Sequence, residues 1–295
     1  MGHGVLVTGA TGTVGRHLVG RLLAHGVRVR ALCRSPESAA ALLPQGVEIA
    51  RGDLTDSATL ESALRGVDAA FVLLAEDAGE AFARAAHRAV GLRQLVVVSA
   101  DAPQGPGFDN PLFVKHVRGE ARLRATALPL TVLRPGPFAS LALQWAPALA
   151  AGDVVGVVHP DLAVPVIDPR DIAEVAAAVL LGPEPPGVRI LPLSGPQALD
   201  VHARVRVLGE VLGRELKVAR IAEEQWVRLA AGRIPEAYAR QLIEVERYLI
   251  RRRLPVVASV REITGSAPRS FRTWAQDHLA AFSAPHRAPS FEEAS

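Results

Sequence analysis

The sequence predicts an α/β protein with a doubly wound parallel sheet and a smaller C-terminal part. Two observations lead to this fold class. Short Val/Leu-rich runs alternate with helix-patterned segments in the first half of the chain, and parallel strands need a helix for each crossover. The chain also opens with an apolar run, three glycines spaced three apart and a helical pattern, in GVLVTGATGTVGRHLVGRLLAHG.

This opening segment predicts a dinucleotide-binding turn. A strand around 5–7 precedes Gly9, Gly12 and Gly15. The glycines let the chain turn sharply and bring its backbone against a pyrophosphate, which would lie at the N-terminus of a helix at 13–25. The residues between the glycines are expected to contact the cofactor as well, and they are Thr11, Thr13 and Val14.

The spacing of the glycines, GxxGxxG, resembles that of the short-chain dehydrogenase/reductase superfamily. The form TGATGTVG resembles the extended and atypical members, which combine a Rossmann-type nucleotide fold and a small substrate-binding part in one chain. The resemblance implies a cofactor site beyond the carboxyl ends of the strands, where such sheets bind their ligands.

The remaining elements are predicted from the alternation of apolar runs with helical patterns. Strands are expected at 27–32, 47–50, 69–75, 94–100 and 130–135, and helices at 36–43, 56–65, 78–90 and 113–126. A further helix follows Asp168, whose carboxylate is placed to cap it.

The residues after the second strand predict NADP(H) as the cofactor. NAD-preferring proteins usually carry an acid there, but this chain has Cys33, Arg34, Ser35 and Pro36. Arg34 offers a planar donor fork for the 2′-phosphate of NADP, with Ser35 as a second donor. A solvated surface arginine is the alternative interpretation.

Further cofactor contacts are expected where other strands end. The resemblance implies that Asp53 meets the adenine amino group and that Leu54 forms an apolar wall, whereas Asp56 is a helix cap. Leu74 and Ala75 would pass close to the cofactor after the fourth strand, with plain strand burial as the alternative. Pro135, at the end of the sixth strand, completes this set.

The fifth strand leads to Ser99, at the position of the superfamily's active-site serine, but the usual Tyr and Lys four residues apart are missing. Counting back from Glu120 places His116 at the lysine position and Leu112 at the tyrosine position. His116 is the first catalytic candidate, since an imidazole can relay a proton at neutral pH. Lys115 would replace it if the helix were rotated by one residue.

Each of these residues also has a structural interpretation. His116 can be a helix-face residue with a structural partner, and Lys115 a solvated cation. Glu120 can fix the tautomer of His116 or pair with Arg124.

Three longer segments resemble a narrower family. HVRGE before ALPLTVLRPGPF, then VIDPRDIAEVAAAVL, then LSGPQAL followed by EVLGREL resemble the NmrA-like atypical reductases over about residues 4–220. That family contains azo and quinone reductase-like enzymes, enzymes of secondary metabolism, and regulators that bind a dinucleotide without turning it over.

The chain of 295 residues is divided into an NAD(P)-binding Rossmann domain at 1–136, a mixed region at 137–282 that completes the sheet and forms the substrate-binding part, and a disordered tail at 283–295. The Pro- and Gly-rich loop 101–111 is interpreted as a lid. One cysteine excludes an intramolecular disulfide, no zinc-ligand spacing is found, and a net charge of +3 requires no polyanion.

The predicted function is NADPH-dependent hydride transfer to a small, aromatic or quinone- or imine-like acceptor, in a bacterial and cytoplasmic protein that is a monomer or homodimer. Neither nucleic acid nor a membrane is an expected partner. Without a tyrosine acid, acceptors that delocalise the arriving charge fit better than simple ketones. The alternatives are a non-catalytic NADP(H)-sensing regulator and a non-redox cyclase or isomerase that uses His116 or an acid.

Overall fold

The computed structural model describes residues 4–74, 78–101 and 109–283. Its main sheet has seven strands in the order β3-β2-β1-β4-β5-β6-β8, and every neighbouring pair is parallel. The strands are β1 (Gly4–Thr8), β2 (Arg28–Cys33), β3 (Glu48–Arg51), β4 (Ala69–Leu73), β5 (Gln94–Val98), β6 (Leu130–Pro135) and β8 (Val188–Leu193). The predicted doubly wound fold is therefore confirmed.

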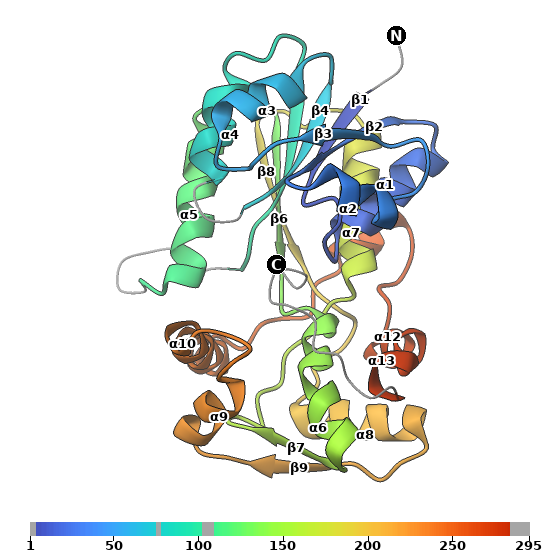
Figure 1. The fold of residues 1–295 in the computed structure, drawn as a ribbon, viewed down its shortest axis with the longest axis vertical. Coiled ribbons are helices and arrows are strands. Elements are labelled where there is room, and N and C mark those ends of the chain that lie inside the picture. Colours follow the sequence, from blue (N-terminus) through green and yellow to red (C-terminus); the bar gives the residue numbers. More distant parts are fainter. Residues whose placement is uncertain (1–3, 75–77, 102–108, 284–295) are drawn as a thin grey trace.

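Helices cover both faces of this sheet (Figure 1). On one face are α1 (Gly15–Ala24), α2 (Pro36–Leu42), α7 (Pro169–Leu181) and α11 (Ser259–Thr264). On the other face are α3 (Ser57–Leu64), α4 (Ala78–Ala86) and α5 (Pro111–Arg124). The apolar side chains of each helical layer pack on one side of the strands, so the sheet lies between two cores.

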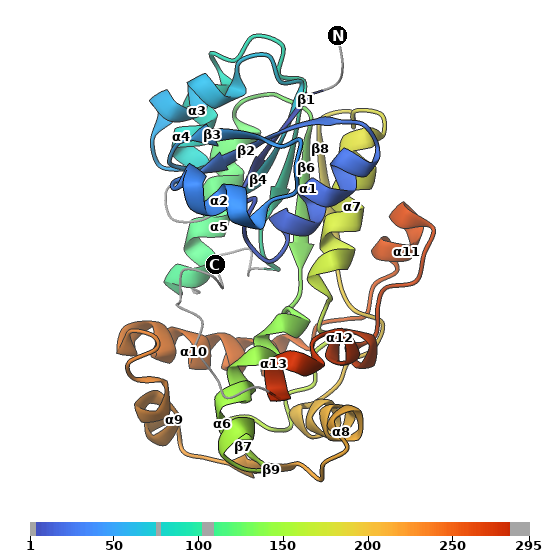
Figure 2. The same ribbon diagram turned by 45° about the vertical axis from the view of Figure 1, so that its right-hand side comes forward.

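A second part lies below the carboxyl ends of the strands (Figures 1 and 2). It begins after β6 and has a hydrophobic core of its own, which includes Trp145, Trp274 and Phe282. Its elements are η1 (Ala139–Trp145), α6 (Ala146–Ala151), β7 (Val154–Val157), α8 (Val201–Leu212), β9 (Lys217–Arg220), α9 (Glu223–Ala230), α10 (Glu236–Arg252), α12 (Phe271–Asp277) and α13 (Leu279–Ser283). β7 and β9 form a two-stranded parallel sheet.

Several predicted boundaries shift. The helix expected at 78–90 ends at Ala86, and the strand expected at 69–75 ends at Leu73. Ser283 is the last residue of α13, so the predicted disordered tail does not begin at this residue. The rest of the predicted tail, 284–295, lies outside the described residues. Ala75 and most of the predicted lid, 102–108, also lie outside them.

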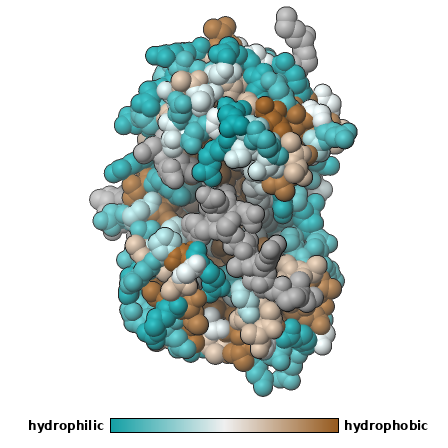
Figure 3. Space-filling model, in the orientation of Figure 1, coloured by the Kyte–Doolittle hydropathy of each residue, from teal (hydrophilic) through white to brown (hydrophobic). Residues whose placement is uncertain are grey.

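On the face seen in Figure 3, hydrophilic side chains cover much of the surface of both parts. Within the described ranges, no helix is both long and apolar enough to span a bilayer. The residues described also contain no group of three or more His, Cys, Asp or Glu side chains placed to hold a metal ion.

Two glycines allow α4 and α5 to cross at close range. A Cβ atom added to Gly79 would lie 2.4 Å from the Cα atom of Gly119, and one added to Gly119 would lie 2.7 Å from the side chain of Leu74. Real Cβ atoms do not approach backbone so closely, and interiors are packed too densely to yield without cost. The close crossing therefore requires glycine at position 79, whereas a methyl group at position 119 would have to displace the end of the Leu74 side chain.

We expect Gly79→Ala to lower the free energy of unfolding by about 2 kcal/mol, because the added methyl group pushes the two helices apart. The control is Gly20→Ala in α1, where an added Cβ meets no atom within 4 Å. That variant should be neutral or up to about 1 kcal/mol more stable, owing to helix propensity. Urea denaturation of the two variants measures both values, and equal stabilities would contradict the packing argument.

Candidate functional site

The glycine-rich turn after β1 has the shape expected for a phosphate-binding site. Gly9 has φ +61°, and a Cβ atom on Gly15 would lie 2.1 Å from the carbonyl oxygen of Gly9. The N–H of Gly12 donates to that same oxygen at 3.0 Å. Only glycine fits at Gly9 and Gly15 without distortion, so α1 begins directly against the turn and presents its first N–H groups to a bound anion.

The rest of the predicted turn surrounds this backbone. Thr11 is exposed, Thr13 is half-buried, and Val14 is buried immediately before α1. Thr8, at the end of β1, is buried; its hydroxyl donates to the carbonyl oxygen of Phe71 and accepts from the N–H of Leu73. These bonds hold the turn against the end of β4.

The residues after β2 and β3 lie near one another. Arg34 and Ser35 are exposed, and no side-chain hydrogen bond from Ser35 caps α2. Hydrogen bonds from the N–H and hydroxyl of Thr55 hold the pKa of the Asp53 carboxyl below its usual value, and the charge of Arg34 acts in the same direction. The carboxylate of Asp53 therefore stays ionised beside an exposed guanidinium, with the half-buried Leu54 next to it.

At the ends of the central strands the predicted positions are apolar. Leu74 is 3% exposed and Pro135 is buried. Asp168 and Asp56 cap their helices as predicted, with carboxylates accepting from the N–H groups of Arg170 and Ala58. These two acids are therefore structural.

A buried carboxylate joins α5 to two strands. Ser99 donates its hydroxyl proton to Glu120 at 2.6 Å, and Arg134 of β6 donates to both oxygens of the same carboxylate at 3.0 and 2.6 Å. Arg124 donates to it at 3.2 Å, which confirms the predicted Glu120–Arg124 pair. Burial would raise the pKa of the Glu120 carboxyl, but the hydrogen bonds from Arg134 and Ser99 outweigh it and lower that pKa.

His116 lies one turn before Glu120 on α5. Burial lowers the pKa of its imidazole to about 4, the adjacent charge of Lys115 adds to this effect, and Glu120 opposes it. The Nδ1 atom is buried and has no hydrogen-bond partner among the described residues, and no hydrogen bond joins it to Glu120 there. His116 is therefore a neutral imidazole at pH 7 with an unused ring nitrogen.

Helix α10 approaches this part of α5 from the second part, as both ribbon views show (Figures 1 and 2). Asn110 caps α5 through Leu112, and its amide donates to the carbonyl oxygen of Gln241 at 3.0 Å and to Glu244 at 3.1 Å. The ring of Tyr248 meets that of Phe113 edge-on, with centroids 5.8 Å apart. Since 241, 244 and 248 lie on one helical face, this face of α10 contacts α5.

Sequence reasoning did not anticipate these contacts. Tyr248 and Arg252 have the spacing of the Tyr and Lys that are missing from α5, but they lie far downstream in the sequence. Their hydrogen bond, together with the effect of Asp101 on the pKa of Tyr248, places the tyrosine near the carboxyl end of β5. No local signal in the sequence links residues this far apart.

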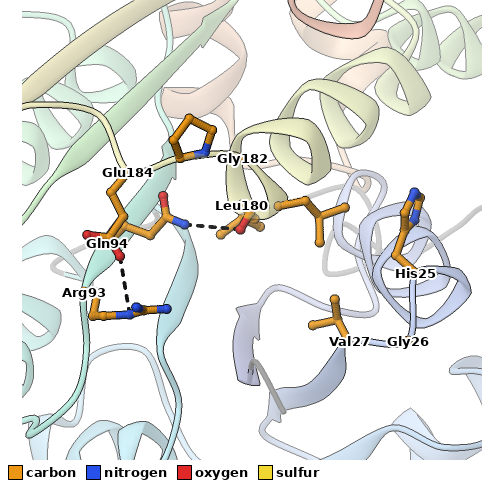
Figure 4. Close-up of a pocket in the computed structure, with 10 residues that line it drawn as sticks. His25, Gly26, Val27, Arg93, Gln94, Leu180, Gly182 and Glu184 are labelled. Carbon is orange, nitrogen blue, oxygen red and sulfur yellow. Dashed lines mark hydrogen bonds and ion pairs between the residues drawn. The ribbon is translucent and has the colours of Figure 1, made fainter. Parts of the chain in front are cut away.

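A groove lies at the other end of the strands, where β2 and β5 begin and α7 ends (Figure 4). Gln94 donates to the carbonyl oxygen of Leu180 at 3.2 Å, and its own buried Oε1 lacks a partner among the described residues. Arg93 pairs with Glu184 at 3.3 Å along the same groove. Because the strands' carboxyl ends point away from it, this groove is separate from the candidate site.

The fold and the turn define a Rossmann-type nucleotide-binding protein. The chain belongs to the NmrA-like family, whose model matches residues 1–254. This confirms the resemblance seen in the sequence.

The relatives that match nearly the whole chain include two named reductases. One, from Streptomyces griseus, is a (4-alkanoyl-5-oxo-2,5-dihydrofuran-3-yl)methyl phosphate reductase, 36% identical over 281 residues, which are 94% of this chain and 99% of the relative. The other is an NAD(P)H azoreductase from Xenophilus azovorans, 30% identical over 288 residues, 95% of this chain and 99% of the relative.

Among solved structures, the fold is similar to that of the NADPH-dependent quinone oxidoreductase QOR2 from Escherichia coli in complex with NADPH. The TM-score is 0.80 at 22% identity, over 94% of this chain and 99% of that one.

We expect Glu120→Gln to lower the free energy of unfolding by about 3 kcal/mol at pH 7, because it removes the charge that balances the half-buried guanidinium of Arg134. Since the folded-state pKa of Glu120 lies below its unfolded value of 4.5, the wild-type advantage is complete above pH 4.5 and is lost as the pH falls through the folded pKa. Thermal and urea unfolding between pH 3 and 8 measure it.

The control is Glu80→Gln, whose exposed carboxylate pairs with Arg122 on the surface. This variant should change stability by less than about 1 kcal/mol at any pH. A Glu120→Gln effect of the same small size would show that the buried network does not hold α5.

Proposed function

We propose that this chain transfers a hydride from NADPH to a small acceptor whose carbon–carbon double bond is conjugated with a carbonyl group. The single observation that carries the proposal is the composition of the site on α5. Leu112 stands at the tyrosine position and a neutral His116 at the lysine position, so the helix supplies neither a phenol nor a cation there. Such a site suits an acceptor that spreads the arriving charge over its own atoms.

The sequence predicted an NAD(P)H-dependent reductase that uses NADP(H). The two relatives named above are reductases as well. The chain's own residues fit the cofactor. Gly9 and Gly15 form a turn that a Cβ atom would obstruct, and α1 begins against it. We place Thr11, Gly12, Thr13 and Val14 along the same phosphates, and Arg34 and Ser35 on the 2′-phosphate.

The remaining cofactor contacts follow the strand ends. We propose that Asp53 and Leu54 hold the adenine, and that Leu74 and Pro135 lie along the cofactor beyond β4 and β6. The nicotinamide end would then reach Ser99 and His116, and the region 137–282 would close over it as the substrate-binding part. Bound NADPH supplies the hydride.

Two site residues take defined roles in this proposal. The proton of Ser99 is held by Glu120 at 2.6 Å, so the hydroxyl oxygen is left to accept a hydrogen bond from the carboxamide or ribose. The neutral His116 can donate or accept through the ring nitrogen that has no described partner. Lys115, its neighbour, acts on it through charge.

The name of the Streptomyces griseus relative supports the acceptor class. The 5-oxo-2,5-dihydrofuran ring carries a double bond conjugated with the ring carbonyl and with the alkanoyl carbonyl. Hydride addition at the far carbon of that bond leaves the negative charge shared by two oxygens. We propose an acyl-bearing unsaturated lactone of this kind as the substrate class.

We expect Arg34→Gln to weaken NADPH binding 10- to 100-fold and NADH binding less than threefold, because one charge-assisted bidentate contact to a phosphate is lost. Calorimetric titration with each cofactor measures this. The control is Arg88→Gln, an exposed arginine paired with Glu61 on α3, which should leave both affinities unchanged. Equal losses for NADPH and NADH would contradict the role of Arg34.

The test of the acceptor class compares an acyl-substituted unsaturated lactone with a saturated ketone of similar size, following NADPH oxidation. We expect the lactone to be reduced at least 100-fold faster, and His116→Ala to lower kcat at least tenfold. His87→Ala, an exposed histidine after α4, is the matched control. Efficient reduction of the saturated ketone, unaffected by His116→Ala, would overturn the proposal.

A further inference from the structure

The second part contributes a phenol to the candidate site. We propose that Tyr248 of α10 is a catalytic residue that donates a hydrogen bond, and then its proton, to the carbonyl oxygen of the conjugated acceptor. This inference rests on the proposed function, and it supplies the acid that α5 lacks.

The position of Tyr248 is fixed by contacts on two sides. Asn110 ties the beginning of α5 to Gln241 and Glu244 of α10 at 3.0 and 3.1 Å. Tyr248 follows Glu244 by one turn on the same face, and its ring packs edge-on against Phe113. The half-buried tyrosine therefore cannot leave this place without loss of the α5–α10 contact.

Along α5 the relevant residues form one row. Phe113, His116 and Glu120 are spaced three and four residues apart, so they lie on one face of the helix. Phe113 meets Tyr248 at the first end of the row, and Glu120 meets Ser99 at the other. His116, with its unpartnered Nδ1, lies between these contacts. The row connects the phenol to the carboxyl end of β5, where the nicotinamide is expected.

The charges around the phenol favour a proton donor at neutral pH. Burial raises the pKa of Tyr248 and the carboxylate of Asp101 raises it further, whereas the charge of Arg252 and its hydrogen bond lower it. Titratable groups within four residues of the Phe113–Tyr248 contact include Lys115 and His116 on α5 and Glu244 on α10. The phenol is protonated at pH 7, and Arg252 is in place to stabilise the phenolate once the proton has left.

The step balances as follows. Bound NADPH would supply the hydride for the new C–H bond at the far carbon of the conjugated double bond and would thereby become NADP⁺. The displaced π electrons move to the carbonyl oxygen, the O–H bond of Tyr248 breaks, and its proton goes to that oxygen. The resulting enol tautomerises to the saturated carbonyl compound by exchange with water, and water returns one proton to the phenolate.

The first experiment is Tyr248→Phe, assayed with NADPH and the acyl-substituted unsaturated lactone. We expect kcat to fall at least tenfold with KM changed less than threefold, while calorimetry shows unchanged NADPH binding. The control is Tyr238→Phe, a half-buried tyrosine earlier on the same helix, which should keep the wild-type kcat. An active wild type with an equally active Tyr248→Phe overturns this inference alone, whereas a wild type that reduces no conjugated acceptor overturns the proposed function.

A second pair of variants keeps the test decisive if Tyr248→Phe misfolds. Asp101→Asn removes the charge that raises the pKa of the phenol, so the alkaline fall in kcat should move to lower pH. Arg252→Gln removes the charge that lowers this pKa, so the same fall should move to higher pH. If Tyr248 had a purely structural role, the alkaline fall in kcat would stay at the wild-type pH in both variants. Shifts of this fall in the same direction in both variants would also overturn the proposal.

Discussion

The orientation of α5, and with it most of the candidate site, depends on the hydrogen bonds of the buried Glu120 carboxylate. That carboxylate is held by Ser99 after β5 and by Arg134 in β6. An unpaired buried charge costs several kcal/mol, so α5 can neither turn nor slide without a large loss. A helix fixed in this way presents His116 and Phe113, one and two turns earlier, toward the carboxyl ends of the strands. A structural carboxylate thus sets the geometry of residues that it does not touch.

Local patterns in the sequence were sufficient to predict the framework. The strand expected at 130–135 is β6, residue for residue, because its apolar run is bounded by a loop on one side and by proline on the other. The caps at Asp56 and Asp168 were also readable, since a cap bonds residues only two positions away. The turn at Gly9 and Gly15 follows from the same kind of short-range rule, in which glycine is the residue that a close backbone approach requires.

What the sequence did not reveal depends on distant contacts. Arg134 lies fourteen residues from Glu120, and Asn110 reaches α10 over more than 130 residues. No periodicity encodes such pairs, because each is set by how the completed sheet and the second part pack together. The low pKa of His116 is of the same kind. It arises from burial by neighbouring elements, whereas the sequence predicted an imidazole with its ordinary pKa.

These long-range contacts also explain why the second part matters for chemistry as well as for substrate recognition. Around α5, the carboxylate of Glu120 is already satisfied by Arg134 and the imidazole of His116 is neutral. The carboxylate repels a negative charge that develops on a substrate oxygen, and the neutral imidazole stabilises such a charge less than a fixed cation would. The charge must therefore be spread within the acceptor or met from the other side of the site. Helix α10 reaches that side, anchored to α5 by Asn110 and by the Phe113–Tyr248 contact. In this arrangement the element that shapes the substrate-binding part also sets which acceptors can be reduced.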